Sequence, residues 1–191
     1  MSSNVIEIFG FVTGFLAIIL SIRQYIWTWL FDVITNILFI RIFWQAGQYV
    51  DVVFRSLFIL LALYGWYVWV YQKKNTNEMQ VSRLGLKKLS LLGTVGVINA
   101  IILWLFLRPG GTPLFDVIAV VLVIMSQYLL AKKYLESWYV LLVSDILLIG
   151  VYFDWKLYFF SLLSTATFIM CLIGLQQWRK ALQGVKSKLI A

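Results

Sequence analysis

The segment YLESWYVLLVSD, from Tyr134 to Asp145, has a related copy 109 residues earlier, YIWTWLFDVITN, from Tyr25 to Asn36. The alignment pairs Tyr25 with Tyr134, Trp29 with Trp138, and Asn36 with Asp145. On a helix, Trp138 and Asp145 are seven residues apart and share one face. An acidic residue inside a membrane span is costly and by default marks a substrate or ion path. We therefore interpret the chain as two copies of one helical unit that bring this face to a shared central site.

The composition predicts an integral membrane protein. The chain has 191 residues, of which 62% are hydrophobic and 13% charged, and its mean hydropathy is +0.91. A soluble domain has about half its residues apolar and about a quarter charged. The net charge of +8 comes from basic residues in short loops between apolar runs. That placement favours charges that set membrane topology over a nucleic-acid surface.

Seven apolar runs approach the roughly 20 residues that a membrane-spanning helix needs. They cover residues 5–22, 27–44, 49–71, 89–107, 114–131, 138–153 and 157–178. Because backbone polar groups facing lipid must be satisfied internally, these runs predict an all-α membrane protein. We expect three segments: a first three-helix repeat over 1–71, a cytoplasmic loop and linking helix over 72–110, and a second repeat with a basic tail over 111–191.

The two repeats are expected to have the same orientation. Residues 5–69 align with 114–178 without gaps, and Glu7 falls on Asp116 and Arg23 on Lys132. The fourth span is the extra helix of a 3+1+3 plan, and an odd inserted helix makes the repeat parallel, as in sugar carriers of the SWEET type. That architecture predicts a substrate site at the bilayer midplane between the two three-helix repeats, each of which we call a triplet.

The distribution of positive charge predicts the orientation in the membrane. Of 16 Lys and Arg residues, twelve fall on one side, three on the other, and Arg55 lies within a span. The side rich in Lys and Arg is cytoplasmic by the positive-inside rule. We therefore expect the N-terminus outside and the C-terminus in the cytoplasm.

The residues available for chemistry argue against an enzyme. The chain has no histidine and one cysteine, Cys171, within the last apolar run, where a packing role is expected. No HExxH, Gly-x-Ser-x-Gly or phosphate-binding loop occurs. We expect no cofactor, no metal site and no ATP-driven step. A scaffold or channel subunit is disfavoured because the repeats place polar residues at matched positions.

The chain resembles the PnuC family of vitamin transporters along nearly its whole length. The segments that carry the resemblance are IEIFGFVTGFLAIILSIRQ, IWTWLFDVITNILF, YGWYVW and SQYLLAKKYLESW. The resemblance implies uptake of a B-type vitamin, foremost nicotinamide riboside, with thiamine or riboflavin as the alternatives. It also implies facilitated diffusion with alternating access, trapping by a cytoplasmic vitamin kinase, a homotrimer, and a place in the bacterial inner membrane.

The candidate substrate-binding residues are polar or aromatic positions near the presumed midplane: Trp29, Asp32, Asn36, Arg55, Gln127, Trp138 and Asp145. An acid could pair with a cationic ring, and an indole could stack on one. The alternatives are hydrogen bonds between helices for Asn36 and Asp145, and anchoring at the membrane interface for the tryptophans. Compared with the family pattern, Asp32 replaces a glycine, Arg55 a glutamine and Leu141 a second tryptophan, which leaves the vitamin undecided.

Charge compensation is expected around Arg55. Asp51 lies four residues before Arg55, the spacing of an ion pair within one helix. Asp32 lies one turn before Asn36 on the same face, where it could add negative charge to the path or pair with Arg55 or Arg41.

Overall fold

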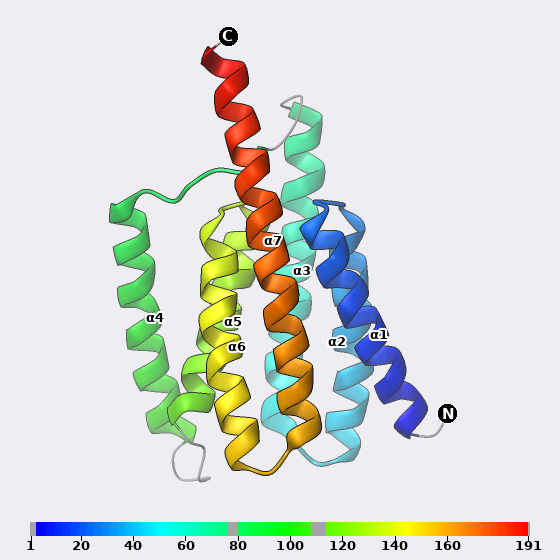
Figure 1. The fold of residues 1–191 in the computed structure, drawn as a ribbon. Helices are drawn as coiled ribbons and strands as arrows, with labels where there is room; N and C mark the ends of the chain where they lie inside the picture. The colour runs from blue at the N-terminus through cyan, green and yellow to red at the C-terminus, as the bar shows by residue number, and fades with distance from the viewer. Residues whose placement is uncertain (1–2, 76–79, 108–113, 191) are drawn as a thin grey trace. The chain divides into compact units, whose positions relative to one another are not determined.

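The computed structural model describes residues 3–75, 80–107 and 114–190, and these form seven α-helices (Figure 1). The helices are α1 (Ser3–Ile22), α2 (Trp27–Gln45), α3 (Tyr49–Asn75), α4 (Leu86–Leu107), α5 (Leu114–Ala131), α6 (Glu136–Asp154) and α7 (Tyr158–Ile190). Each is long and apolar enough to cross a membrane. The prediction of an all-α protein with seven spans is confirmed.

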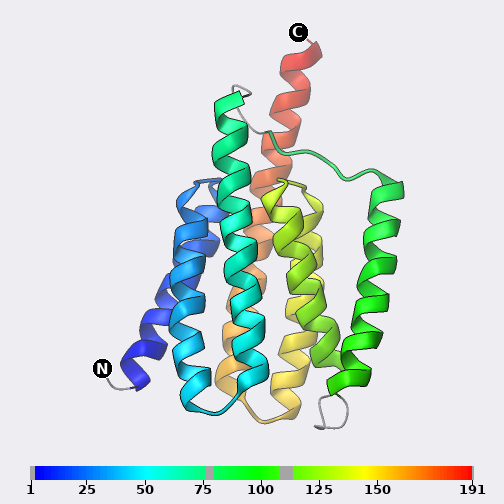
Figure 2. The ribbon, with the colours of Figure 1, turned by 180° about the vertical axis from the view of Figure 1, so that it is seen from behind.

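The chain divides into two compact units, Met1–Met79 and Gln80–Ala191. In the first, α2 packs against both α1 and α3; in the second, α6 packs against both α5 and α7 (Figure 2). The extra helix α4 packs against α5. This order is consistent with the 3+1+3 plan. The expected boundary at residue 71 falls inside α3, and the one at residue 110 lies outside the described residues.

The turns that end four of the helices recur at the spacing of the repeat. Gln24 and Lys133 follow α1 and α5 with φ values of 58° and 51°, and Gly47 and Lys156 follow α2 and α6 with φ values of 72° and 61°. At each turn, the left-handed residue donates to the carbonyl three residues earlier and its successor to the carbonyl five earlier, at 2.8–3.2 Å. These bonds form a Schellman motif, which satisfies the free carbonyls of a helix end.

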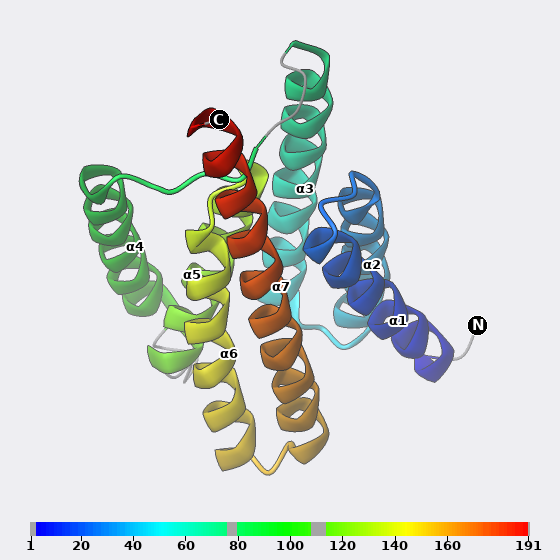
Figure 3. The same cartoon turned by 45° about the horizontal axis from the view of Figure 1, so that its top comes forward.

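Two helices continue well past their predicted ends. α3 reaches Asn75 rather than residue 71, and α7 reaches Ile190 rather than residue 178. Figure 3 shows the end of α7 projecting beyond α5 and α6. The predicted limits were placed where the apolar runs stop. Lys, Gln, Leu and Ala are good helix formers in water, so both helices continue beyond the apolar runs that span the membrane.

The segment before α4 is bound to the turn between α5 and α6 by what we term the linker clip. Ser82 donates its backbone N–H to Lys133 at 3.1 Å and accepts one from Leu135 at 3.0 Å. The Leu84 N–H donates to Glu136 Oε2 at 2.9 Å. Val81, 3% exposed, is buried beside this bridge. The predicted loop is therefore ordered where it meets the second unit.

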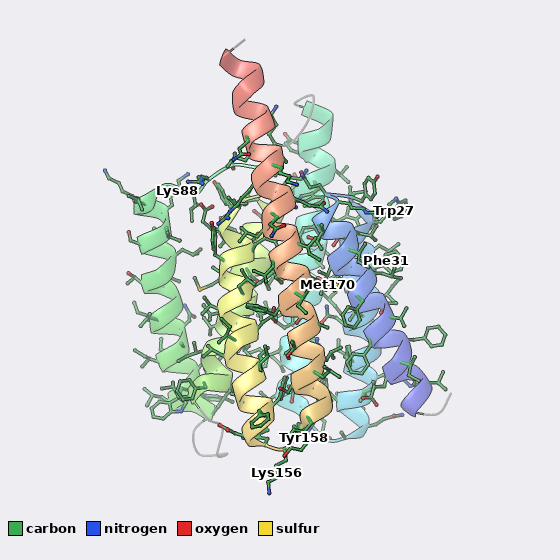
Figure 4. All side chains as sticks on the ribbon, in the orientation of Figure 1. Trp27, Phe31, Lys88, Lys156, Tyr158 and Met170 are labelled. Atoms are coloured by element: carbon green, nitrogen blue, oxygen red, sulfur yellow. The ribbon has the colours of Figure 1, made fainter. Side chains whose placement is uncertain are left out.

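Lys88 at the start of α4 and Lys156 between α6 and α7 lie at opposite ends of the second unit (Figure 4). Which of these ends faces the cytoplasm stays a prediction. α4 carries large exposed apolar side chains, including Ile102 and Phe106. In a membrane protein such a surface is solvated by lipid.

Candidate substrate-binding site

Asp145 is a buried acid in the middle of α6. Its side chain is 8% exposed, and Oδ1 accepts a hydrogen bond from the Thr167 hydroxyl of α7 at 3.1 Å. The Cys171 thiol interacts with the same carboxylate. Oδ2 is buried without a hydrogen-bond partner in the described part of the chain. A ligand that reached this oxygen would supply the partner that the protein does not.

Asn36, the repeat mate of Asp145, has a different environment. It is 3% exposed, and its Nδ2 donates to Asp32 twice, at 2.9 Å to the carbonyl and 3.2 Å to Oδ1. Its Oδ1 accepts from Arg55 Nη1 at 3.4 Å. A side-chain amide has two N–H donors and one acceptor oxygen. Both donors are therefore used within the first unit, and Asn36 has only acceptor capacity left for a ligand.

Arg55 compensates charge in this network, as expected. Its guanidinium lies over the rings of Phe39 and Phe43, at 4.7 and 5.5 Å from their centroids. It also interacts electrostatically with Asp51 one turn away. The Asn36 amide bridges Asp32 to Arg55. The first triplet thus brings together three of the predicted residues: the acid Asp32, the cation Arg55 and the neutral Asn36.

Trp29 and Trp138 are enclosed within their own triplets. Each is 1% exposed and makes an edge-to-face contact with a tryptophan of the third helix, Trp69 at 5.4 Å and Trp178 at 5.5 Å. Their rings lie over Gly65 and Gly174, where an added Cβ would come within 2.5 Å of the indole. In each triplet, the indole therefore packs the middle helix against the third helix. Stacking on a substrate, the role predicted for them, stays a prediction.

Hydroxyl groups next to the two candidate residues join the middle helix of each triplet to the first. Ser144 donates to the Ala119 carbonyl of α5 at 3.1 Å. The matched Thr35 lies 2.8 Å from the Thr13 hydroxyl of α1. Hydrogen bonds between helices of this kind are common in membranes. These bonds fix the position of the middle helix along the first helix, and with it the level at which Asn36 and Asp145 lie in their triplets.

Two residues that contact Asp145 were not predicted to belong to the site. Gln127, which was predicted, lies partly buried on α5. Thr167 was not singled out, and Cys171 was assigned to packing alone. Their spacing of four residues places both on one face of α7 and is the signal that could have found them. No group of three potential metal ligands occurs among the described residues.

Comparisons with known proteins agree on one family. Residues 4–180 match the model of the nicotinamide mononucleotide transporter family. The nicotinamide riboside transporters PnuC of Escherichia coli strain K12 and of Shigella flexneri are each 26% identical over 201 residues, 91% of this chain and 84% of theirs. The solved crystal structure of a vitamin B3 transporter PnuC matches with a TM-score of 0.76 at 20% identity, over 94% of this chain and 83% of that one.

The chain belongs to the nicotinamide mononucleotide transporter family. The family model covers nearly the whole chain, including both triplets and α4. The likeness to the solved transporter shows that the fold is shared. Membership in this transporter family, with its seven apolar helices, identifies a multi-pass membrane protein. It also agrees with the prediction that the chain is a transporter rather than an enzyme.

Proposed function

We propose that this family member takes up a B-type vitamin, foremost nicotinamide riboside, by facilitated diffusion, and that Asp145 contacts the substrate. The observation that carries the proposal is the buried Asp145 carboxylate with a free oxygen in the middle of α6. An acid in an apolar span requires compensation, and a positively charged substrate provides it. The relatives that match over most of their length are named nicotinamide riboside transporters.

The chemistry of the vitamin fits such a site. Nicotinamide riboside has a positively charged pyridinium ring and a ribose with hydroxyl donors, and a carboxylate can attract the first or accept from the second. Thiamine is also a cation and is the first alternative, whereas riboflavin is neutral. We therefore rank a cationic substrate above a neutral one.

The wider scheme of transport is part of the same proposal. In it, the carrier lies in the bacterial cytoplasmic membrane with the N-terminus outside and the C-terminus inside. It alternates access across a central site, works as a homotrimer, and depends on a cytoplasmic kinase that phosphorylates the vitamin. Proteoliposomes that accumulate free vitamin only under an imposed ion gradient would overturn the facilitated-diffusion part.

The decisive test is substrate binding by purified Asp145→Asn. This substitution keeps the shape of the side chain and removes its charge. Hydrogen bonds to charged groups contribute about 1.5–3 kcal/mol, so affinity for nicotinamide riboside should fall roughly ten- to a hundredfold. Asp154→Asn, an exposed acid at the end of the same helix, is the matched control. Equal affinities of parent and Asp145→Asn for nicotinamide riboside, thiamine and riboflavin would place the site elsewhere.

A further inference from the structure

Two side chains of α7 interact with the Asp145 carboxylate. The Thr167 hydroxyl lies 3.1 Å from Oδ1, and the Cys171 thiol, one turn further along α7, interacts with the same group. The Oδ2 atom is left without a partner in the described part of the chain. Oδ1 of the carboxylate therefore accepts from Thr167, whereas Oδ2 stays available to a ligand.

The first triplet lacks this arrangement. The positions that match Thr167 and Cys171 are Phe58 and Ala62, and neither side chain can donate a hydrogen bond. The polar residue held by the third helix therefore differs between the repeats. In the second, α7 supplies donors to an acid; in the first, α3 supplies the cation Arg55 to an amide. The donors Thr167 and Cys171 thus occur in the repeat that has the acid Asp145, and they are missing from the repeat that has Asn36 at the matched position.

Thr167 has two acceptors and one proton. Its hydroxyl also lies 2.9 Å from the Ser164 carbonyl of its own helix, and a hydroxyl has a single hydrogen to donate. A bond to an ionised acceptor is shorter and roughly twice as strong as a bond to a neutral one. When Asp145 is charged, the hydroxyl donates to the carboxylate; when it is not, the helix carbonyl can accept instead.

We infer that Thr167, assisted by Cys171, is a positioning residue that stabilises the ionised Asp145 carboxylate and directs its Oδ2 towards a positively charged substrate. This inference rests on the proposed function. Thr167 acts through Asp145 and requires no contact with the vitamin. The role makes Thr167 selective for charge: its hydroxyl strengthens binding of a cation and contributes little to a neutral ligand of the same shape.

The test compares Thr167→Val with Thr167→Ser in the purified full-length protein. Valine keeps the shape and removes the donor, and serine restores the donor. The probes are nicotinamide riboside and its reduced dihydro form, which has the same groups without the positive charge. We expect Thr167→Val to weaken binding of the cationic probe about tenfold, the loss of one charge-assisted bond, and Thr167→Ser to restore it. Cys171→Ala should change affinity in the same direction by less, because a thiol is a weak donor.

Thr165→Val is the matched control for the hydroxyl. Thr165 bonds the Ser161 carbonyl of the same helix at 2.9 Å, so its loss removes an equivalent hydrogen bond within α7. Affinity for nicotinamide riboside should be close to the parent value in this control. Melting temperatures of all variants in detergent establish that they are folded.

The outcomes separate this inference from the proposed function. If Asp145→Asn binds poorly while Thr167→Val binds like the parent, the inference is wrong and the proposed function stands. Equal losses in Thr165→Val and Thr167→Val, or equal losses for the cationic and neutral probes, overturn the positioning role. If Asp145→Asn also binds like the parent, the proposed site and this inference fail together.

Discussion

The two triplets share their framework and differ in their polar centres. The turns after the first and second helices, the tryptophan over a glycine and the hydroxyl that joins the first two helices all recur at matched positions. The charged groups of these centres do not recur: Asp32 and Arg55 are matched by Leu141 and Ser164, and Asn36 by Asp145. The centre of the first triplet is a network whose charges are internally compensated, and the centre of the second is a single acid with a free oxygen. Framework residues were retained in both copies, whereas the groups suited to bind a substrate diverged.

Alanine substitutions at Asn36 and Asp145 should separate stability from binding. Asp145→Ala removes an acid with one free oxygen and should cost affinity for nicotinamide riboside about ten- to a hundredfold. Asn36→Ala breaks the bridge between Asp32 and Arg55 and removes its hydrogen bonds to these half-buried groups, which should cost about 1–3 kcal/mol of stability. Thermal melting and equilibrium binding of both proteins are the measurements. A larger loss of affinity in Asn36→Ala would contradict the difference drawn between the triplets.

Gly65→Ala and Gly174→Ala test whether the shared framework is needed twice. Each adds a Cβ 2.5 Å from an indole, and such overpacking costs about 1–3 kcal/mol of stability. We expect similar losses of melting temperature in the two triplets. Trp138→Phe should partly restore Gly174→Ala because the smaller ring leaves room for the methyl group. Independent, additive effects of Trp138→Phe and Gly174→Ala would show that the contact is not the cause.

Glu136→Gln addresses the linker clip, for which the described part of the first triplet has no counterpart. The substitution weakens the charge-assisted bond to the Leu84 N–H, which lies 2.9 Å from Oε2, and should cost about 1 kcal/mol of local stability. Hydrogen exchange at Leu84 should accelerate, while exchange at α1 and α2 should be unaffected. Uniform acceleration over the whole chain would mean that the clip stabilises the entire fold.

The smallest effect is expected at the turn after the second helix of each triplet. The left-handed backbone there is occupied by Gly47 in the first copy and by Lys156 in the second. A left-handed conformation costs a non-glycine residue roughly 1 kcal/mol or more. Lys156→Gly should therefore raise the melting temperature slightly, and Gly47→Ala should lower it. A lower melting temperature in Lys156→Gly, or a higher one in Gly47→Ala, would contradict this expectation.

Sequence alone predicted the framework better than the site. The apolar runs located all seven helices, because a membrane span needs a minimum length of apolar residues. The polar ends of α3 and α7 were missed, because hydropathy does not report helix outside the membrane. Asp145 was found as an acid in an apolar run. Its donor Thr167 was not, because a threonine in a span has a self-sufficient bond to its own helix. Which groups meet across helices depends on packing that a repeat alignment does not contain.

The linker clip has a consequence for biosynthesis. The Leu84 N–H and its acceptor Glu136 are 52 residues apart, with α4 and α5 between them. Membrane segments are inserted as the chain is made. The segment before α4 therefore stays in water, without its bonding partners, until α4 and α5 have both been inserted across the membrane. The bonds can close only if the crossings between them are even in number, which places the linker and the α5–α6 turn on the same side of the membrane. A chain that inserted with one crossing too few could not form the clip, and hydrogen exchange at Leu84 would report the error.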